Sequence, residues 1–422
     1  MKIKIRNLSY DKVATLPERK HHRPVNPNPI LKQLILLLSK GELKNVGFEC
    51  EKHGMERLEK GEPCLVLMNH SSFIDLKIVE TIMKDHPLNI ICTSDGLVGK
   101  EWLMRQVGCI PTNKFVTDVQ MVKDMVYALH TLKSSVLMYP EASYSFDGTA
   151  TPIPDSLGKC VKLLKVPVIM IRTHGAFLRD PLYNNLQVRD VKVTADVTYL
   201  FSKEEIEHHS AKQIQEKLRE CFSFDYFKEQ QEQNIRIKEP FRADYLNRVL
   251  YKCASCKKEG HMHGEGTTIT CRVCGDKHEL TETGFLKNLS GNNTFTHIPD
   301  WYDWQRKEVR AGLQDGTYSL DVDVDIYVLK DLKCIYKVGD GHLHHGSSGF
   351  YLEGCGGKLQ YEQKPKASYS LYADYYWYEI GDMICIGNMK CLYYCFPKDQ
   401  SLDVVAKTRI ATEELYKMKN NF

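Results

Sequence analysis

The stretch Cys64-Leu-Val-Leu-Met-Asn-His-Ser-Ser-Phe-Ile-Asp75 decides the fold class of this chain. Its first five residues are apolar, which is typical of a strand that is buried on both faces of a sheet. A polar turn follows, in which Ser71 and Ser72 suit the start of a helix. A buried strand, a short turn and a helix form the opening of an α/β unit.

The same alternation continues on both sides of this stretch and predicts an α/β domain with a mixed, largely parallel sheet. Ser202-Lys-Glu-Glu205 has a capping-box pattern, and we expect it to open one long charged helix that runs to about Gln233. The further strand candidates are residues 88–92, 135–139 and 166–171, and the helix candidates are residues 102–107 and 119–132.

His70 and Asp75 are the candidate catalytic residues. With His70 in the turn and Asp75 in the first turn of the helix, the carboxylate can accept a hydrogen bond from one imidazole nitrogen. This contact fixes the tautomer and leaves the other nitrogen as a base, which can take a proton from a hydroxyl as the hydroxyl attacks a carbonyl. Taken alone, the pair is better explained as a helix start that holds a structural histidine.

Four sequence blocks that occur in order favour the catalytic interpretation of this pair over the structural one. The segment NHSSFID at residues 69–75 resembles the NHx4D motif of the PlsC-type glycerolipid acyltransferase family, which includes the lysophosphatidic acid acyltransferases. The blocks GCIPTNK at 108–114, YPEASYS at 139–145 and VPVI at 166–169 resemble that family's later motifs and follow in the family's order. The resemblance covers roughly residues 30–235 and is specific because the blocks occur together.

The resemblance implies an O-acyltransferase with His70 as general base and Asp75 as the residue that orients it. The acyl group would come from a thioester, acyl-CoA or acyl carrier protein, in one direct transfer. The acceptor would be a hydroxyl of a lysophospholipid, with 1-acylglycerol-3-phosphate as the default. The acceptor site would be formed by Asn69, Lys114, Glu141, Ala142 and Ser143. A phosphate on the acceptor calls for a cation and backbone N–H groups.

Three positions depart from the family pattern and keep a second hypothesis open. Lys114 replaces an arginine and loses its bidentate fork, Ala142 replaces a glycine, and Tyr144 removes the motif's second cation. Arg172 follows the fourth block and could supply a cation, but we interpret it as a surface or salt-bridged arginine, and His174 as structural. The alternative is a non-catalytic lipid- or protein-binding scaffold on a degenerate acyltransferase domain.

The segment 241–290 is rich in Cys, His and Gly and contains Cys253-x2-Cys256 and Cys271-x2-Cys274. Two CxxC pairs separated by a hairpin predict a four-cysteine zinc ribbon with a closed, structural Zn²⁺ site. We interpret the nearby His261, His263 and His278 as exposed hairpin residues. Basic and acidic residues nearly cancel in this segment, so no nucleic acid is expected as a partner and a protein or structural role is favoured.

Residues 291–422 form a β-rich domain that ends in a helix, an order that resembles a pleckstrin-homology-like domain. Residues 1–240 would then be the acyltransferase domain and 241–290 the ribbon. The run His342-Leu-His344-His345 is a second conceivable metal patch, but the flanking glycines favour an exposed turn. The strand candidates are 318–329, 333–338, 349–352, 369–378, 383–386 and 390–396, and the closing helix is expected at 402–419.

Composition indicates the class of protein and the compartment in which it is expected. The 422 residues are 42% apolar and 26% charged, which excludes a disordered chain or a fibre, and the fifteen cysteines in a mostly apolar context favour a reducing compartment. Residues 1–24 hold seven basic and two acidic side chains and precede the apolar run ILKQLILLL at 30–38. A basic arm and a short apolar helix suit an anionic membrane surface or, equally, packing on the protein itself. We therefore expect a cytoplasmic protein, peripheral on the inner face of the membrane.

Overall fold

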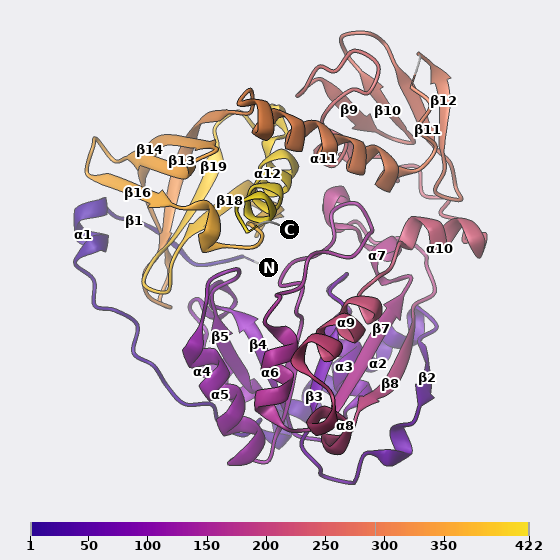
Figure 1. The fold of residues 1–422 in the computed structure, drawn as a ribbon, viewed down its shortest axis with the longest axis vertical. Helices are drawn as coiled ribbons and strands as arrows, with labels where there is room; N and C mark the ends of the chain where they lie inside the picture. The colour runs from indigo at the N-terminus through magenta and orange to yellow at the C-terminus, as the bar shows by residue number, and fades with distance from the viewer. Residues whose placement is uncertain (1, 292, 421–422) are drawn as a thin grey trace.

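The computed structural model describes residues 2–291 and 293–420. Within these residues the strands gather into three sheets, which we call the N-terminal sheet, the ribbon sheet and the C-terminal sheet. Figure 1 shows the N-terminal sheet in the lower half, the C-terminal sheet at the upper left and the ribbon sheet at the upper right. Helix α11 (Ile298–Asp315) runs between the two upper sheets.

The N-terminal sheet has the order β2-β8-β7-β3-β6-β4-β5 and is mixed and largely parallel, as predicted. The strands β7, β3, β6, β4 and β5 are parallel to one another, whereas β8 runs antiparallel to β7 and parallel to β2. The bounds are β2 (Glu49–His53), β3 (Leu65–Met68), β4 (Leu88–Thr93), β5 (Cys109–Thr112), β6 (Ser135–Met138), β7 (Val168–His174) and β8 (Thr194–Phe201).

Helices cover both faces of this sheet, which explains why β3 is apolar throughout. Leu65 and Leu67 point into a core with α5, α6, α8 and α9, and Val66 and Met68 point into a core with α2 and α3. The helices are α2 (Pro29–Asn45), α3 (Asp75–Ile82), α4 (Glu101–Val107), α5 (Val119–His130), α6 (Leu157–Leu164), α7 (Ala176–Arg179), α8 (Lys203–His208), α9 (Ala211–Cys221) and α10 (Tyr226–Glu232).

The long helix expected from Ser202 to about Gln233 is wrong, because α8, α9 and α10 occupy this segment as separate helices. Ser202 does form the predicted capping box with Glu205. Ser210 forms a second capping box and the Asp225 side chain accepts from a backbone N–H of α10, so each starts a new helix. The pattern of charged residues continues across Ser210 and Asp225, so it does not indicate the ends of α8 and α9.

The ribbon sheet is antiparallel with the order β12-β11-β10-β9. It packs on α11, where Trp301 donates from its indole nitrogen to the Lys252 carbonyl at 3.0 Å. Its strands are β9 (Met262–Glu265), β10 (Thr268–Cys271), β11 (Lys277–Leu280) and β12 (Leu286–Ser290).

The C-terminal sheet has the order β16-β15-β14-β13-β19-β18-β17 and is closed by α12 (Val404–Lys419), the predicted succession of strands and one final helix. Helix α12 packs on α11 and on β17 and β18. The strands are β13 (Leu320–Leu329), β14 (Ile335–Gly346), β15 (Gly349–Gly354), β16 (Leu359–Gln363), β17 (Tyr372–Trp377), β18 (Gly381–Gly387) and β19 (Leu392–Pro397). Single turns of 3₁₀-helix occur at Met55–Arg57, Ser94–Leu97, Leu182–Asn184, Leu246–Arg248, Pro365–Ala367 and Gln400–Leu402.

The run at 342–345 is part of β14, so the expected exposed turn is wrong. Gly341 lies inside the strand, where β14 and β15 approach so closely that a Cβ would meet the Glu353 carbonyl oxygen at 2.2 Å, so only glycine fits there. The chain reverses instead between Gly346 and Gly349. His345 is buried as a result, with its ring stacked on Phe350 at 3.9 Å.

The start of the chain lies with the C-terminal sheet. Strand β1 (Ile5–Asn7) pairs in parallel with β14, with Ile5 opposite Ile335, and is followed by α1 (Tyr10–Ala14). The first residues thus leave the α/β unit to which we assigned them and cross to the other half of the molecule. In the described part of the chain, no helix has both the length and the apolar character that a membrane span requires.

Candidate active site and metal centre

His70 and Asp75 meet at the carboxyl end of β3. His70 follows the strand by two residues and Asp75 is the first residue of α3, with 3.0 Å between His70 Nδ1 and Asp75 Oδ2. The same carboxylate oxygen accepts from the backbone N–H groups of Ser71 at 2.8 Å and Ser72 at 3.1 Å. Because a carboxylate only accepts, Nδ1 carries the hydrogen and Nε2 keeps a free lone pair.

Two tyrosine rings enclose the His70 imidazole. Tyr139 stacks on it with ring centroids 4.2 Å apart, and Tyr144 lies 4.2 Å away on a tilted plane. This burial lowers the pKa of His70, which the hydrogen bond and charge of Asp75 oppose and the Lys114 ammonium reinforces. A lowered pKa keeps the imidazole neutral near pH 7, which is the form that can act as a base.

Glu141 is fully buried and holds protein groups with both carboxylate oxygens. It lies in the segment 139–145 that follows β6, which we call the motif loop. Oε2 accepts from the backbone N–H of His70 at 3.0 Å, and Oε1 accepts from Thr151 N–H at 2.9 Å and Thr151 Oγ1 at 3.1 Å. Burial raises the pKa of Glu141 to about 7, although these donors favour the charged form. Glu141 therefore positions the backbone at His70.

Asn69 is also fully buried and joins strand ends. Its Oδ1 accepts from the Thr173 N–H of β7 at 2.8 Å, and its Nδ2 donates to Thr173 Oγ1 at 2.9 Å and Ser71 Oγ at 3.1 Å. A further hydrogen bond reaches the Tyr226 hydroxyl on α10. Asn69 thus fixes the turn that carries His70.

Lys114 lies beyond β5 and faces the cavity that His70 lines. Its Nζ lies 4.3 Å from the centroid of the Tyr372 ring of β17, a cation–π contact. Burial lowers the pKa of Lys114, and the charges of Asp374 and Asp95 oppose this effect. The block that ends in Lys114 therefore contacts the C-terminal sheet.

Ala142 and Ser143 complete the residues predicted for the acceptor site. Ala142 has a φ of 52°, the left-handed region that glycine adopts without strain, and it lines the cavity. Ser143 is buried, with its hydroxyl 3.2 Å from the Tyr144 carbonyl, and it accepts from Arg409 of α12. Of the five residues predicted to hold the acceptor, Lys114 and Ala142 line the cavity, and the other three bind protein groups.

The cavity next to His70 has a volume of about 780 Å³. One part of its wall is apolar, with Ile90, Ile91, Val119, Val122 and Met138. The C-terminal half of the chain supplies another part of the wall, with residues that no motif in the sequence singles out. These residues are Lys366, Ala367, Ser368, Tyr369 and Tyr416.

Arg172 and His174 do not line this cavity. The guanidinium of Arg172 lies 5.8 Å from the centroid of the Phe224 ring. His174 contacts a carboxylate with each ring nitrogen, Glu229 at 2.7 Å and Asp196 at 3.0 Å, and Glu229 is the larger cause of its raised pKa. The two carboxylates account for His174, in agreement with its interpretation as a structural histidine.

The four ribbon cysteines converge. The Sγ atoms of Cys253, Cys256, Cys271 and Cys274 all lie within 4.8 Å of one another, with 3.6 Å between Cys253 and Cys274 and 3.7 Å between Cys256 and Cys271. A tetrahedral zinc with Zn–S bonds of about 2.3 Å sets its sulfur atoms roughly 3.8 Å apart. The donor set and its spacing are therefore compatible with zinc.

His278 is fully buried on β11, so the expectation that it is an exposed hairpin residue is wrong. Alternate residues of this short strand point inward, and the His278 ring packs edge-on against Trp301 of α11 at 5.4 Å. His261 is exposed and His263 is half-buried, in agreement with the interpretation of this pair as hairpin residues.

Comparison with known proteins relates part of the α/β unit to the acyltransferases. Residues 49–173 match the family model of the acyltransferases, a span that contains His70, Asp75 and the motif loop. The chain is also similar to the 1-acyl-sn-glycerophosphate (LPA) acyltransferase PlsC from Thermotoga maritima, with 17% identity over 44% of this chain and 79% of that chain and a TM-score of 0.33. No curated protein sequence matches the chain.

Proposed function

We propose, from the acyltransferase domain that residues 49–173 match, that this chain moves a fatty acyl group from a thioester to a hydroxyl of a glycerolipid such as 1-acylglycerol-3-phosphate. The donor would be acyl-CoA or acyl carrier protein. The observation that carries the proposal is the His70–Asp75 pair, 3.0 Å apart, at the wall of a cavity of about 780 Å³ with a lysine on the same wall. Such a pair supplies the base that acyl transfer to an alcohol needs.

The proposed reaction is a direct transfer. Nε2 of His70 takes the acceptor's hydroxyl proton while the oxygen attacks the thioester carbonyl. The C–S bond then breaks, and the departing thiolate takes the proton back from the imidazolium, which yields the ester and a free thiol. Asp75 stabilises the imidazolium in between because its oxygen already accepts from Nδ1.

The cavity wall fits an acceptor with a charged head and an apolar chain. Lys114 lines the same wall as His70 and can bind a phosphate as a point charge, and Lys159 and Lys366 are exposed members of that wall. The apolar part of the wall, with Ile90, Ile91, Val119, Val122 and Met138, offers room for an acyl chain. A lysophospholipid combines both features.

A membrane surface is the proposed source of this substrate. Helix α2 packs against α3 and α4 and leaves apolar side chains in solvent, a face that suits the interface of an anionic bilayer. Phe73, three residues after His70, is also exposed. The exposed side chains are Ile30, Leu34, Leu37 and Leu38 on α2 and Trp102 and Leu103 on α4.

Zinc is the proposed ligand of the four ribbon cysteines. A site with four thiolates has no open position, so its role would be to hold the ribbon sheet together and the metal would take no part in acyl transfer.

A panel of lysophospholipid acceptors, assayed for thiol release from acyl-CoA and from acyl carrier protein, tests the proposal. The wild type is expected to consume thioester with at least one acceptor, and His70→Ala to lose about 10²–10⁴-fold in kcat because its base is gone. His174→Ala is the matched control, since this histidine also pairs with carboxylates but lies outside the cavity wall. Equal background for wild type and His70→Ala with every acceptor would favour the scaffold hypothesis.

A further inference from the structure

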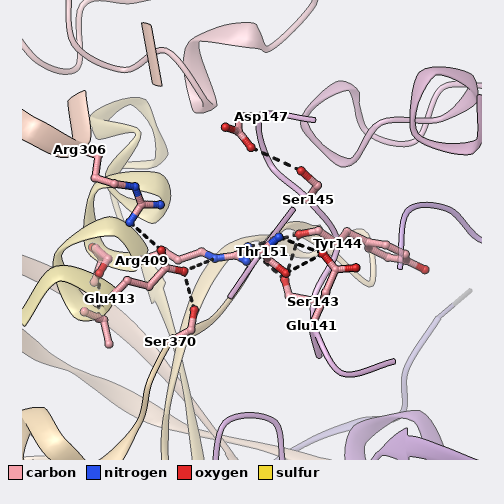
Figure 2. A network of polar contacts seen from close by, with 12 residues as sticks. Glu141, Ser143, Tyr144, Ser145, Asp147, Thr151, Arg306, Ser370, Arg409 and Glu413 are labelled. Atoms are coloured by element: carbon pink, nitrogen blue, oxygen red, sulfur yellow. Dashed lines mark hydrogen bonds and ion pairs between the residues drawn. The ribbon is translucent and has the colours of Figure 1, made fainter. Parts of the chain in front are cut away.

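The motif loop is held from the far end of the chain. Arg409 of α12 donates from Nη1 to Ser143 Oγ at 3.2 Å and to the Tyr144 carbonyl oxygen at 3.3 Å, as Figure 2 shows. Its guanidinium also lies 4.4 Å from the centroid of the Phe146 ring. The side chain is 3% exposed, so these contacts are made away from solvent.

A buried charge network fixes Arg409 in this orientation. Its Nε lies 3.3 Å from Glu413 Oε1, and the same glutamate forms an ion pair with Arg306 of α11 at 2.8 Å and accepts a hydrogen bond from Ser370 at 2.7 Å. Glu413 is 1% exposed, and it is shared by two guanidinium groups. Glu413 thus engages the Nε side of Arg409, and Nη1 donates to the motif loop.

The loop that Arg409 holds encloses the catalytic imidazole. The rings of Tyr144 and Tyr139 both lie 4.2 Å from the His70 ring, and Glu141 accepts from the His70 backbone N–H. Any movement of the loop therefore changes both the orientation of His70 and its exposure to water.

The same loop lacks a cation of its own. Tyr144 occupies the position at which the resembling acyltransferase motif has an arginine. Arg409 delivers a guanidinium to the backbone of that very residue from 265 positions away. Tyr369, also from the C-terminal half, donates from its hydroxyl to the Pro140 carbonyl at 3.5 Å and lines the cavity.

We propose that Arg409 is a positioning residue of the acyltransferase site, that it brings from α12 a guanidinium to a motif loop with no cation of its own, and that the site is complete only with the C-terminal domain in place. The expected effect on kcat rests on the proposed function, whereas the expected effect on the position of His70 does not. Arg409 acts through Ser143 and Tyr144 on His70, and it touches no reacting atom.

The test uses the full-length chain with Arg409→Met, Arg409→Lys and the double variant Arg409→Met/Tyr144→Arg. Lys407→Met is the matched control, because Lys407 lies on the same helix and also has a carboxylate partner, Glu259 at 2.8 Å, and an aromatic partner, Tyr318 at 5.4 Å. All variants are first compared by melting temperature, so that a loss of fold is recognised.

The first measurement is the titration of the His70 imidazole by NMR on histidine-labelled protein, with His70→Gln to assign the signal. Loss of Arg409 frees Tyr144 and admits water, so the lowered pKa of His70 is expected to rise by about 0.5 or more in Arg409→Met. The other charged or titratable groups around the ring, Asp75, Lys114, Glu141, Tyr139 and Tyr144, keep their identity in this variant. Lys407→Met is expected to leave the titration where it is.

The second measurement is steady-state kinetics. Arg409→Met is expected to lower kcat about tenfold or more with KM for the acceptor nearly unchanged, because positioning of His70 is lost and substrate contacts are kept. Arg409→Lys, which keeps the charge without the fork, and the double variant, which returns an arginine to the loop, are expected to recover part of kcat.

The two measurements separate two failures. An inert wild type whose His70 titration still responds to Arg409→Met overturns the proposed function and supports the positioning role. A folded Arg409→Met with unchanged titration overturns the positioning role, whatever the activity of the wild type. An equal fall of kcat in Lys407→Met and Arg409→Met would also overturn it, since the effect would then be general to α12.

Discussion

Two opposing influences act on the pKa of His70. The rings of Tyr139 and Tyr144 remove water from the imidazole and lower its pKa, whereas the oxygen of Asp75 favours the protonated form that arises when a hydroxyl is deprotonated. A base that is neutral at rest and stabilised once charged suits proton transfer near pH 7. The two influences can be separated by substitution.

Asp75→Asn removes the charge while it keeps an oxygen for the N–H groups of Ser71 and Ser72. We expect the fold to persist, kcat to fall about 10²-fold, and the pKa of His70 to move further down, because the imidazolium loses its counter-charge. The acid limb of the kcat/KM profile should therefore move to lower pH, opposite to the shift expected for Arg409→Met.

The pH profile of thioester consumption with the best acceptor measures this shift. Phe73→Leu, an exposed position in the same turn, serves as the control for local disturbance. An acid limb that moves up, or does not move while kcat falls, would contradict the role of Asp75 as counter-charge.

The local parts of the site could be predicted from the sequence, and the distant parts could not. His70 and Asp75 are five residues apart on a strand, turn and helix, so their pairing follows from local geometry. Glu141 was expected at the acceptor, yet its oxygens are occupied by backbone groups at His70 and Thr151. Nothing in the residues near Glu141 indicates those partners, because the sheet order brings β6 beside β3.

At the scale of single elements, apolar runs located β3, β4, β6 and β7 of the N-terminal sheet and six strands of the C-terminal sheet, whereas β1, β2, β5 and β8 were not predicted. The errors occurred where a local signal had two meanings. Gly341 was read as part of a turn but permits close approach between β14 and β15, and a continuous charge pattern concealed the caps that divide α8, α9 and α10. Strand β16 carried no clear pattern and was missed. The pleckstrin-homology-like topology of the C-terminal sheet stays a prediction.

Helix α2 supports a prediction about membrane contact. Ile30 and Leu37 are 79% and 63% exposed, so charges at both positions leave the core of the protein intact. Ile30→Glu/Leu37→Glu is expected to weaken binding to vesicles with anionic lipids by about tenfold or more, because burial of each side chain in the interface contributes about 1.5–3 kcal/mol. Vesicle sedimentation over a range of lipid concentrations measures the change.

Leu163→Glu provides the control for that experiment. Leu163 is 59% exposed on α6, which covers the opposite face of the N-terminal sheet from α2. If Leu163→Glu weakened vesicle binding as much as the α2 variant, or if neither changed it, α2 would not be the membrane-facing element.

At the scale of the whole molecule, the three sheets are joined through helices. The ribbon sheet packs on α11, α11 packs on α12, and α12 carries Arg409 to the motif loop. Residues of the C-terminal half therefore contribute to a site whose recognisable motifs all lie before residue 170. Such a dependence is invisible in the sequence, because the partners are 265 positions apart and neither belongs to a motif that pairs them.

This arrangement gives the predicted zinc a consequence beyond the ribbon. Purified protein is expected to contain about one zinc per chain, and Cys253→Ser to lose it, because a four-thiolate site loses a ligand that water replaces poorly. Without the metal, amide hydrogen exchange should rise in β9–β11 and extend to α11, since Trp301 and Gln305 hydrogen-bond to the chain that leads into the first cysteine pair. Exchange in β3 and β6 should stay low, because these strands lie in cores of their own.

Metal analysis and exchange followed by mass spectrometry test both parts on the same sample. Cys221→Ser is the control, a free thiol at the end of α9 outside the cysteine cluster, and it should retain zinc and the wild-type exchange pattern. Less than about half an equivalent of zinc, or wild-type exchange in Cys253→Ser, would contradict a structural metal. If amide exchange rose in the ribbon sheet alone, α11 would be held by α12 alone. The ribbon would then be separable from the acyltransferase site.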